Sequence, residues 1–319
     1  MKFGIFPFQL TAHPKLVIEH TVLAEELGFG SAWIAEHHGL SHMFPDALSI
    51  LAAAAVRTSR IKLGTQTVVP LRHPLDLAER GAIVDALSDG RLILGAGQGY
   101  APEEFAWFGI PEDTRLARFK ESIELIRRLW SEDRVTYQGE IFSLTDARVE
   151  PRPVQSPPPI WLLAWAEPAV RRAAKIGDGW LPGPSASLAD IKEKVAIYRE
   201  ARGDDARIPL CRFVFVAESE EDAIEHGGKP FYRFFQDTYL RWPHPVVGRS
   251  LTPDSTYEQV ARDRFIIGTS DSVAEQIRHW NEEVGISELV CYMHQIGSDE
   301  ADVRRSMELF ASNVAPRFA

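Results

Sequence analysis

Hydrophobic and polar positions follow two alternating patterns along the chain. Short apolar runs have the length of buried strands and lie at residues 2–8, 31–35, 61–69, 91–97, 160–164, 179–181, 210–217 and 288–293. Between most of them, apolar residues recur at helical spacing over residues 16–27, 46–57, 74–87, 116–130, 170–176, 188–201 and 273–284. Strands that alternate with helices in this way predict an α/β fold, a (β/α)8 TIM barrel formed by residues 1–319 as a single domain.

Two segments interrupt this alternation. Residues 135–159 contain a predicted hairpin, with strands at 135–137 and 141–143, and then a proline-rich linker. Residues 219–265 are rich in aromatic side chains, including Phe234, Tyr239 and Trp242. We expect both to be insertions at the C-terminal face of the barrel. The second either closes over the barrel mouth as a lid or packs as a helical hairpin.

Composition narrows the classes of partner. The formal charge of −10 disfavours binding to nucleic acid or to an anionic membrane, which leaves a small molecule as the expected partner. The apolar run at 47–56 is too short to cross a membrane, and the N-terminus reads as a strand and not as a secretory signal. Cys211 and Cys291 lie in separate apolar runs, as reduced core cysteines do, so we expect a cytoplasmic protein.

The strongest candidate for chemistry is the tripeptide Glu36-His37-His38, which follows the apolar run ending at Ala35. Strand ends at the C-terminal face of a parallel barrel carry its active site, and imidazole transfers protons near neutral pH. A hydrogen-bonded structural pair is an alternative. Metal binding through His38 and His42 would use helical ligand spacing, but the carboxylate of a metalloprotease helix is missing between them. We therefore predict no metal site.

Three further patterns each have a functional and a structural interpretation. The glycines of Gly95–Tyr100 let backbone amides approach a flat ring or a phosphate, although such runs also occur in ordinary turns. Thr65, Gln66 and Thr67 place polar groups in a buried strand, where a polar ring, other side chains or water can pair with them. Arg118 lies near the start of a predicted helix. It either pairs with a phosphate at the rim of the barrel or lies on a solvated helix surface.

Together these residues resemble the bacterial luciferase-like flavin monooxygenases over nearly the whole chain. The matching segments are Met1–Gly4, Glu25–Phe29, Trp33–His38, Leu63–Thr65, His73–Pro74, Leu87–Arg91, Phe108–Gly109, Gly268–Thr269, Gly285–Ser287 and Met307–Phe310. The resemblance implies a barrel that binds reduced FMN at its mouth. It also implies that His37 handles protons beside the ring, positioned by Glu36 and His38.

The resemblance also assigns residues to the cofactor and the substrate. Cofactor-binding positions are Thr65, Gln66, Thr67, Gly97, Gln98, Gly99, Arg118, Trp165, Ala166 and Glu167. The positive charge that pairs with the phosphate would come from Arg118 or from Arg115 instead. Phe6, Phe8, Trp107 and Trp180 would wall an apolar substrate pocket. Luciferase has a non-prolyl cis peptide that here would join Gln66 to Thr67. Its reactive cysteine is replaced by Gly97, so light emission is not implied.

We therefore expect a monooxygenase that uses reduced FMN and dioxygen to oxidise a small apolar organic molecule, with a separate flavin reductase as partner. One alternative is hydride transfer with a deazaflavin coenzyme, as in related barrels. Others are a non-catalytic flavin-binding, luciferase-subunit-like protein and an aldolase-type or metal-dependent barrel hydrolase. A homodimer is a further expectation from relatives.

Overall fold

A parallel sheet forms the centre of the computed structural model, which describes residues 1–7, 13–39, 44–204, 206–240, 246–295 and 297–319. Its strands are β1 (Lys2–Phe6), β2 (Ser31–Ala35), β3 (Lys62–Val68), β4 (Leu92–Gly97), β7 (Ile160–Leu162), β8 (Gly179–Trp180), β9 (Pro209–Val216), β10 (Phe265–Gly268) and β11 (Glu288–Tyr292). The 9 strands are hydrogen-bonded in the order β10-β9-β11-β1-β2-β3-β4-β7-β8. All the predicted strands are present, and β10 is added to them.

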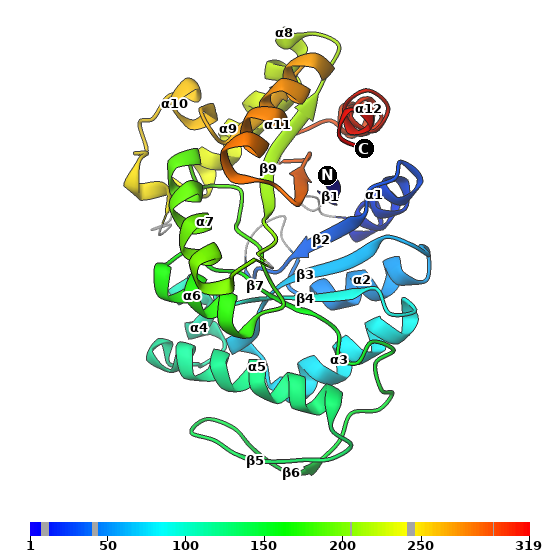
Figure 1. Cartoon of the computed structure of the whole chain (residues 1–319), viewed down its shortest axis with the longest axis vertical. Helices are drawn as coiled ribbons and strands as arrows, with labels where there is room; N and C mark the ends of the chain where they lie inside the picture. The colour runs from blue at the N-terminus through cyan, green and yellow to red at the C-terminus, as the bar shows by residue number, and fades with distance from the viewer. Residues whose placement is uncertain (8–12, 40–43, 205, 241–245, 296) are drawn as a thin grey trace.

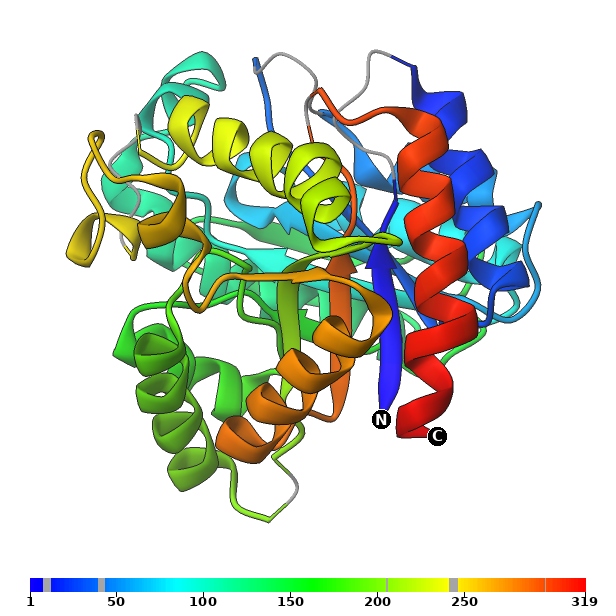
Figure 2. The ribbon, with the colours of Figure 1, turned by 90° about the horizontal axis from the view of Figure 1, so that it is seen from above.

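Helices surround these strands (Figures 1 and 2). They are α1 (Pro14–Glu26), α2 (Ala47–Ala55), α3 (Pro74–Leu87), α4 (Pro102–Trp107), α5 (Arg115–Ser131), α6 (Glu167–Ile176), α7 (Leu188–Arg202), α8 (Glu220–Asp222), α9 (Lys229–Asp237), α10 (Tyr257–Ala261), α11 (Ser270–Val284) and α12 (Glu300–Leu309). Short turns of helix are η1 (Val69–Leu71), η2 (Glu112–Thr114), η3 (Ala223–Gly228), η4 (Val247–Arg249), η5 (Phe310–Val314) and η6 (Ala315–Phe318). Within the described residues, no helix is long and apolar enough to cross a membrane.

An inner hydrophobic cluster shows how the strands enclose a core. Its buried members are Phe6, Trp33, Ile93, Leu181, Cys211 and Val290. They come from strands at both ends of the hydrogen-bonded order, because Leu181 follows β8 and Cys211 lies in β9. Side chains of distant strands meet in this way only when the sheet curls on itself, as in an α/β barrel. The other face of the strands packs against the helices in a larger cluster.

The aromatic insertion packs onto the C-terminal half of β9. That strand pairs with β11 from Pro209 to Phe213 and with β10 from Phe213 to Val216. The Phe213 ring lies 5.2 Å from Phe231 and 5.3 Å from Phe235, both on α9. Residues 219–265 thus pack on β9 through α9, and Phe234 and Tyr239 also reach the barrel mouth, so the lid stays a prediction. Trp242 of this segment lies outside the described residues.

The first insertion runs along the outside of α5 and is not confined to one end of the barrel (Figure 1). Its hairpin consists of antiparallel strands β5 (Val135–Gln138) and β6 (Ser143–Ala147). The following linker reaches the start of β4, where the Gln155 side chain donates to the Leu92 carbonyl at 2.9 Å. The expected C-terminal placement is partly correct, because Phe142 in the hairpin turn packs on His73 just after β3, whereas the linker lies at the start of β4.

The second hairpin strand also starts later than predicted. The Glu121 carboxylate of α5 accepts hydrogen bonds from the amides of Glu140, Ile141 and Phe142, at 2.8–3.2 Å. Because these amides are used by Glu121, residues 140–142 form the turn and pairing resumes at Ser143.

Candidate functional site

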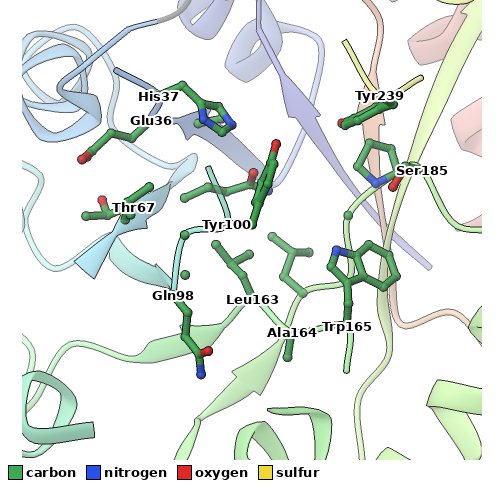
Figure 3. A pocket seen from close by; sticks show the side chains of 18 of the residues that line it. Glu36, His37, Thr67, Gln98, Tyr100, Leu163, Ala164, Trp165, Ser185 and Tyr239 are labelled. Carbon is green, nitrogen blue, oxygen red and sulfur yellow. The ribbon is translucent and has the colours of Figure 1, made fainter. Parts of the chain in front are cut away.

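A cavity of about 510 Å³ opens at the C-terminal ends of the strands. It is lined by residues that follow or end β2, β3, β4, β7, β8 and β11, together with Phe234 and Tyr239 from the aromatic insertion. Figure 3 shows Glu36, His37, Thr67 and Gln98 on one side of it, and Trp165, Ser185 and Tyr239 on the other. The place of the cavity in the barrel is the one that strand-end reasoning predicts.

His37 lines the cavity and is held by a buried carboxylate that the sequence analysis missed. Its Nδ1 lies 3.2 Å from Oε1 of Glu104, which also accepts the His38 amide at 2.8 Å. Glu104 lies on α4 and is 2% exposed. Burial raises the pKa of this carboxyl, but the hydrogen bonds from His37 and His38 outweigh that effect and hold the pKa below its usual value. The site therefore contains an ionised carboxylate behind an imidazole.

Glu36 and His38 form a second pair beside the first. Oε1 of Glu36 lies 3.1 Å from Nε2 of His38 and 3.2 Å from the Arg72 guanidinium. Glu36 still borders the cavity, whereas the His38 ring turns away from it and packs on Phe108. The ring of His37 is thus positioned by Glu104, and the expectation that Glu36 and His38 position it was wrong. His42 lies outside the described residues.

Several polar groups in the cavity wall fit the edge of a flat, polar ring. Within the described part of the chain, the Thr67 hydroxyl and the Gln295 side-chain amide are buried without hydrogen-bond partners. Both residues line the cavity, as do Gln66, Gly97, Gln98 and Gly99. A buried polar group without a partner costs free energy that a bound ring would recover. A Cβ at Gly97 would lie 3.3 Å from Leu163 and 3.5 Å from the Thr67 carbonyl oxygen, so this glycine lets the cavity wall pack closely.

Other predicted cofactor contacts lie away from the cavity. The Thr65 hydroxyl is paired with the Gly95 backbone at 3.1 Å, because it points toward β4. Arg118 donates to the Pro70 carbonyl and stacks on Phe142, so Arg115 provides the arginine that reaches the cavity. Glu167 forms a surface ion pair with Arg171.

The predicted cis bond is also absent. The cis peptide bonds of the described residues are Glu150–Pro151 and Ser156–Pro157, so the Gln66–Thr67 bond is trans. Trp165 and Ala166, by contrast, line the cavity as expected, just before α6 begins.

The predicted substrate wall is only partly correct. Phe6 lines the cavity, and Phe8 lies outside the described residues. Trp107 is 59% exposed, on the outer side of α4. Trp180 packs outward against Tyr198 of α7, because neighbouring strand residues face opposite sides and Leu181 takes the inner one.

Three tyrosines, of which the sequence analysis placed only Tyr239 near the barrel mouth, contribute to the wall. They are Tyr100, Tyr239 and Tyr292. Burial raises the pKa of each phenol, so all three remain protonated at neutral pH and can donate hydrogen bonds. Tyr100 ends the glycine run and Tyr239 belongs to the aromatic insertion expected at the barrel mouth, whereas Tyr292, the last residue of β11, was not singled out.

The fold and cavity define an α/β-barrel enzyme whose site lies at the C-terminal strand ends. The sequence model of the luciferase-like monooxygenase family matches residues 1–288, and the chain belongs to that family.

Relatives within the family differ in chemistry. The chain is 32% identical to an F420-dependent glucose-6-phosphate dehydrogenase of Intrasporangium calvum, covering 95% of this chain and 94% of that protein. It is also 32% identical to 4-hydroxyprotoasukamycin monooxygenase of Streptomyces nodosus subsp. asukaensis, covering 92% and 84%. The crystal structure of monooxygenase RslO1 from Streptomyces bottropensis covers 100% of both chains with a TM-score of 0.86 and 28% identity. The family is therefore one of oxidoreductases, some of which are monooxygenases.

Proposed function

We propose that the protein transfers hydride between a deazaflavin coenzyme and the carbon of an alcohol or carbonyl substrate. The pairing of His37 with the buried Glu104 beside the cavity is the observation that supports proton transfer, and the choice of a deazaflavin rests on a relative. The similarity to an F420-dependent dehydrogenase over 95% of the chain supports this alternative over the FMN monooxygenase that the sequence analysis placed first.

The residues of the cavity have distinct tasks in this proposal. A bound deazaflavin supplies the ring carbon that accepts or gives up the hydride. Thr67, Gln98 and Gln295 would hydrogen-bond the polar edge of the ring. Arg115, together with the backbone amides at the start of α6, would hold a phosphate.

His37 would handle the proton of the substrate hydroxyl. Because Glu104 is ionised, Nδ1–H of His37 donates to it, and the neutral imidazole in the cavity wall would accept a proton at Nε2. The Glu104 carboxylate holds the ring in this tautomer and stabilises the positive charge that develops when Nε2 takes a proton.

A cofactor titration followed by a turnover assay tests the proposal. Purified protein is titrated with the deazaflavin and with FMN, each oxidised and reduced, and turnover of an alcohol panel is then followed without oxygen. Deazaflavin binding with oxygen-independent turnover would support hydride transfer. Binding of neither cofactor would overturn both this function and the one below.

A second candidate is the FMN-dependent monooxygenase with a separate reductase. The 32% identity to 4-hydroxyprotoasukamycin monooxygenase favours it. It predicts tight binding of reduced FMN and oxygen consumption coupled to substrate, measured with an oxygen electrode. The cytoplasmic location and a homodimer remain predictions from the sequence.

A further inference from the structure

The described wall of the cavity carries little positive charge. Arg115 is the one arginine or lysine among its described lining residues, and it lies 3.6 Å from the Glu112 carboxylate. Glu36 adds a second carboxylate, already paired with Arg72. Once a coenzyme phosphate occupies Arg115, no lining arginine or lysine is left in the described part of the chain for an anionic substrate.

The wall opposite His37 is largely apolar and aromatic. It includes Trp165, Leu181 and Pro184, which follow β7 and β8. Tyr239 from the aromatic insertion extends it (Figure 3). Phe234 also lines the cavity, and its ring lies 5.2 Å from that of Tyr239. Burying the apolar body of a ligand against such surfaces is favourable, whereas burying a phosphate beside Glu36 and Glu112 is not.

We propose that the substrate is an uncharged, apolar alcohol or ketone, with Phe234 and Tyr239 contacting its apolar body. This inference rests on the proposed function and separates the protein from the sugar-phosphate specificity in the name of its relative. In the oxidation, the carbinol C–H bond breaks and its electron pair leaves with the hydrogen as hydride to the deazaflavin. The O–H proton goes to Nε2 of His37, and the carbon–oxygen double bond forms.

A substrate comparison in the deazaflavin-loaded enzyme tests this inference. Cyclohexanol and 4-phenyl-2-butanol are compared with glucose 6-phosphate. We expect kcat/KM to be at least about 100-fold higher for the better neutral alcohol, because an unpaired buried anion is penalised more than a missing apolar contact. Equal or faster turnover of glucose 6-phosphate would overturn the inference.

Binding measurements keep the inference separate from the proposed function. If the loaded enzyme oxidises none of the three, calorimetry compares cyclohexanone with glucose 6-phosphate as ligands of the same protein. Tighter binding of cyclohexanone would support the apolar substrate class even though hydride transfer had failed. Equal or tighter binding of the sugar phosphate, or no binding of cyclohexanone, would overturn it.

Two leucine variants of α9 locate the substrate wall. Phe234→Leu shortens a side chain that lines the cavity, and we expect it to raise KM for 4-phenyl-2-butanol about 10-fold. Phe231→Leu is the matched control, since Phe231 lies on the same helix but packs on Phe213 and Phe265 outside the cavity lining. Equal effects of both variants on KM would refute the assignment of Phe234.

Discussion

Replacing Glu104 with glutamine tests the central pair of the site. The carboxylate accepts hydrogen bonds from Nδ1 of His37 at 3.2 Å and from the His38 amide at 2.8 Å, and the substitution keeps its shape while removing its charge. A hydrogen bond to a charged group is worth about 1.5–3 kcal/mol. At about 1.4 kcal/mol for each factor of ten, kcat should fall about 10- to 150-fold.

The assay separates chemistry from binding. Steady-state kinetics with the loaded enzyme should show the loss in kcat, while the Kd of the coenzyme stays within about 2-fold, because Glu104 is not part of the cavity lining. Glu103→Gln is the matched control, since Glu103 is the exposed neighbour on the same turn of α4. If Glu104→Gln and Glu103→Gln have the same kcat, the proton-handling role of the pair is refuted.

The same variant has a signature in stability. Because hydrogen bonds hold the pKa of Glu104 below its usual value, the carboxylate stabilises the fold above the unfolded pKa of about 4.3. That contribution is lost as the pH falls through the folded pKa. The free energy of unfolding of Glu104→Gln should therefore be lower than that of the natural protein at pH 7, and the two should converge in acid.

Three further predictions concern the barrel itself. Gly95→Ala should lower the free energy of unfolding by about 3 kcal/mol in urea titrations, because the new Cβ would lie 1.8 Å from the Thr65 carbonyl oxygen. Gly248→Ala is the control, because nothing lies within 4 Å of a Cβ at that position. Gly97→Val should weaken coenzyme binding at least about 10-fold, since a Cβ there would lie 3.3 Å from Leu163, which also lines the cavity and would have to shift. An unchanged Kd would contradict the ring position. Burial raises the pKa of Glu288, so its contribution to stability is present below about pH 4.3 and is lost as the pH rises through the folded pKa. Glu288→Gln should abolish this pH dependence. An unchanged slope of the unfolding free energy against pH would contradict the prediction.

Most of the barrel was predictable because buried parallel strands are continuous apolar runs with helices between them. β10 was missed because Phe265–Gly268 is a short run whose partner is the end of β9, a pairing no local pattern encodes. The hairpin register failed for a similar reason, since Glu121 binds its turn from 19 residues earlier than Glu140. In both cases, contacts distant in sequence decided the outcome.

The candidate site was predictable where a residue directly ends a strand. This rule places His37, Thr67 and Gly97 at the cavity, as the structure does. The rule fails for Trp180, because a strand of 2 residues is too short for its sequence pattern to show which side chain points into the barrel.

Glu104 was missed for a different reason, which bears on the choice of cofactor. It reaches His37 only because α4 packs beside the loop after β2, 67 residues away in sequence. An imidazole held by a carboxylate serves proton transfer whether the bound ring exchanges hydride with the substrate or reacts with dioxygen. Glu104→Gln should therefore impair both reactions, so it tests the site without deciding the chemistry. The titration with deazaflavin and FMN separates them because it depends on how the cavity wall fits each ring.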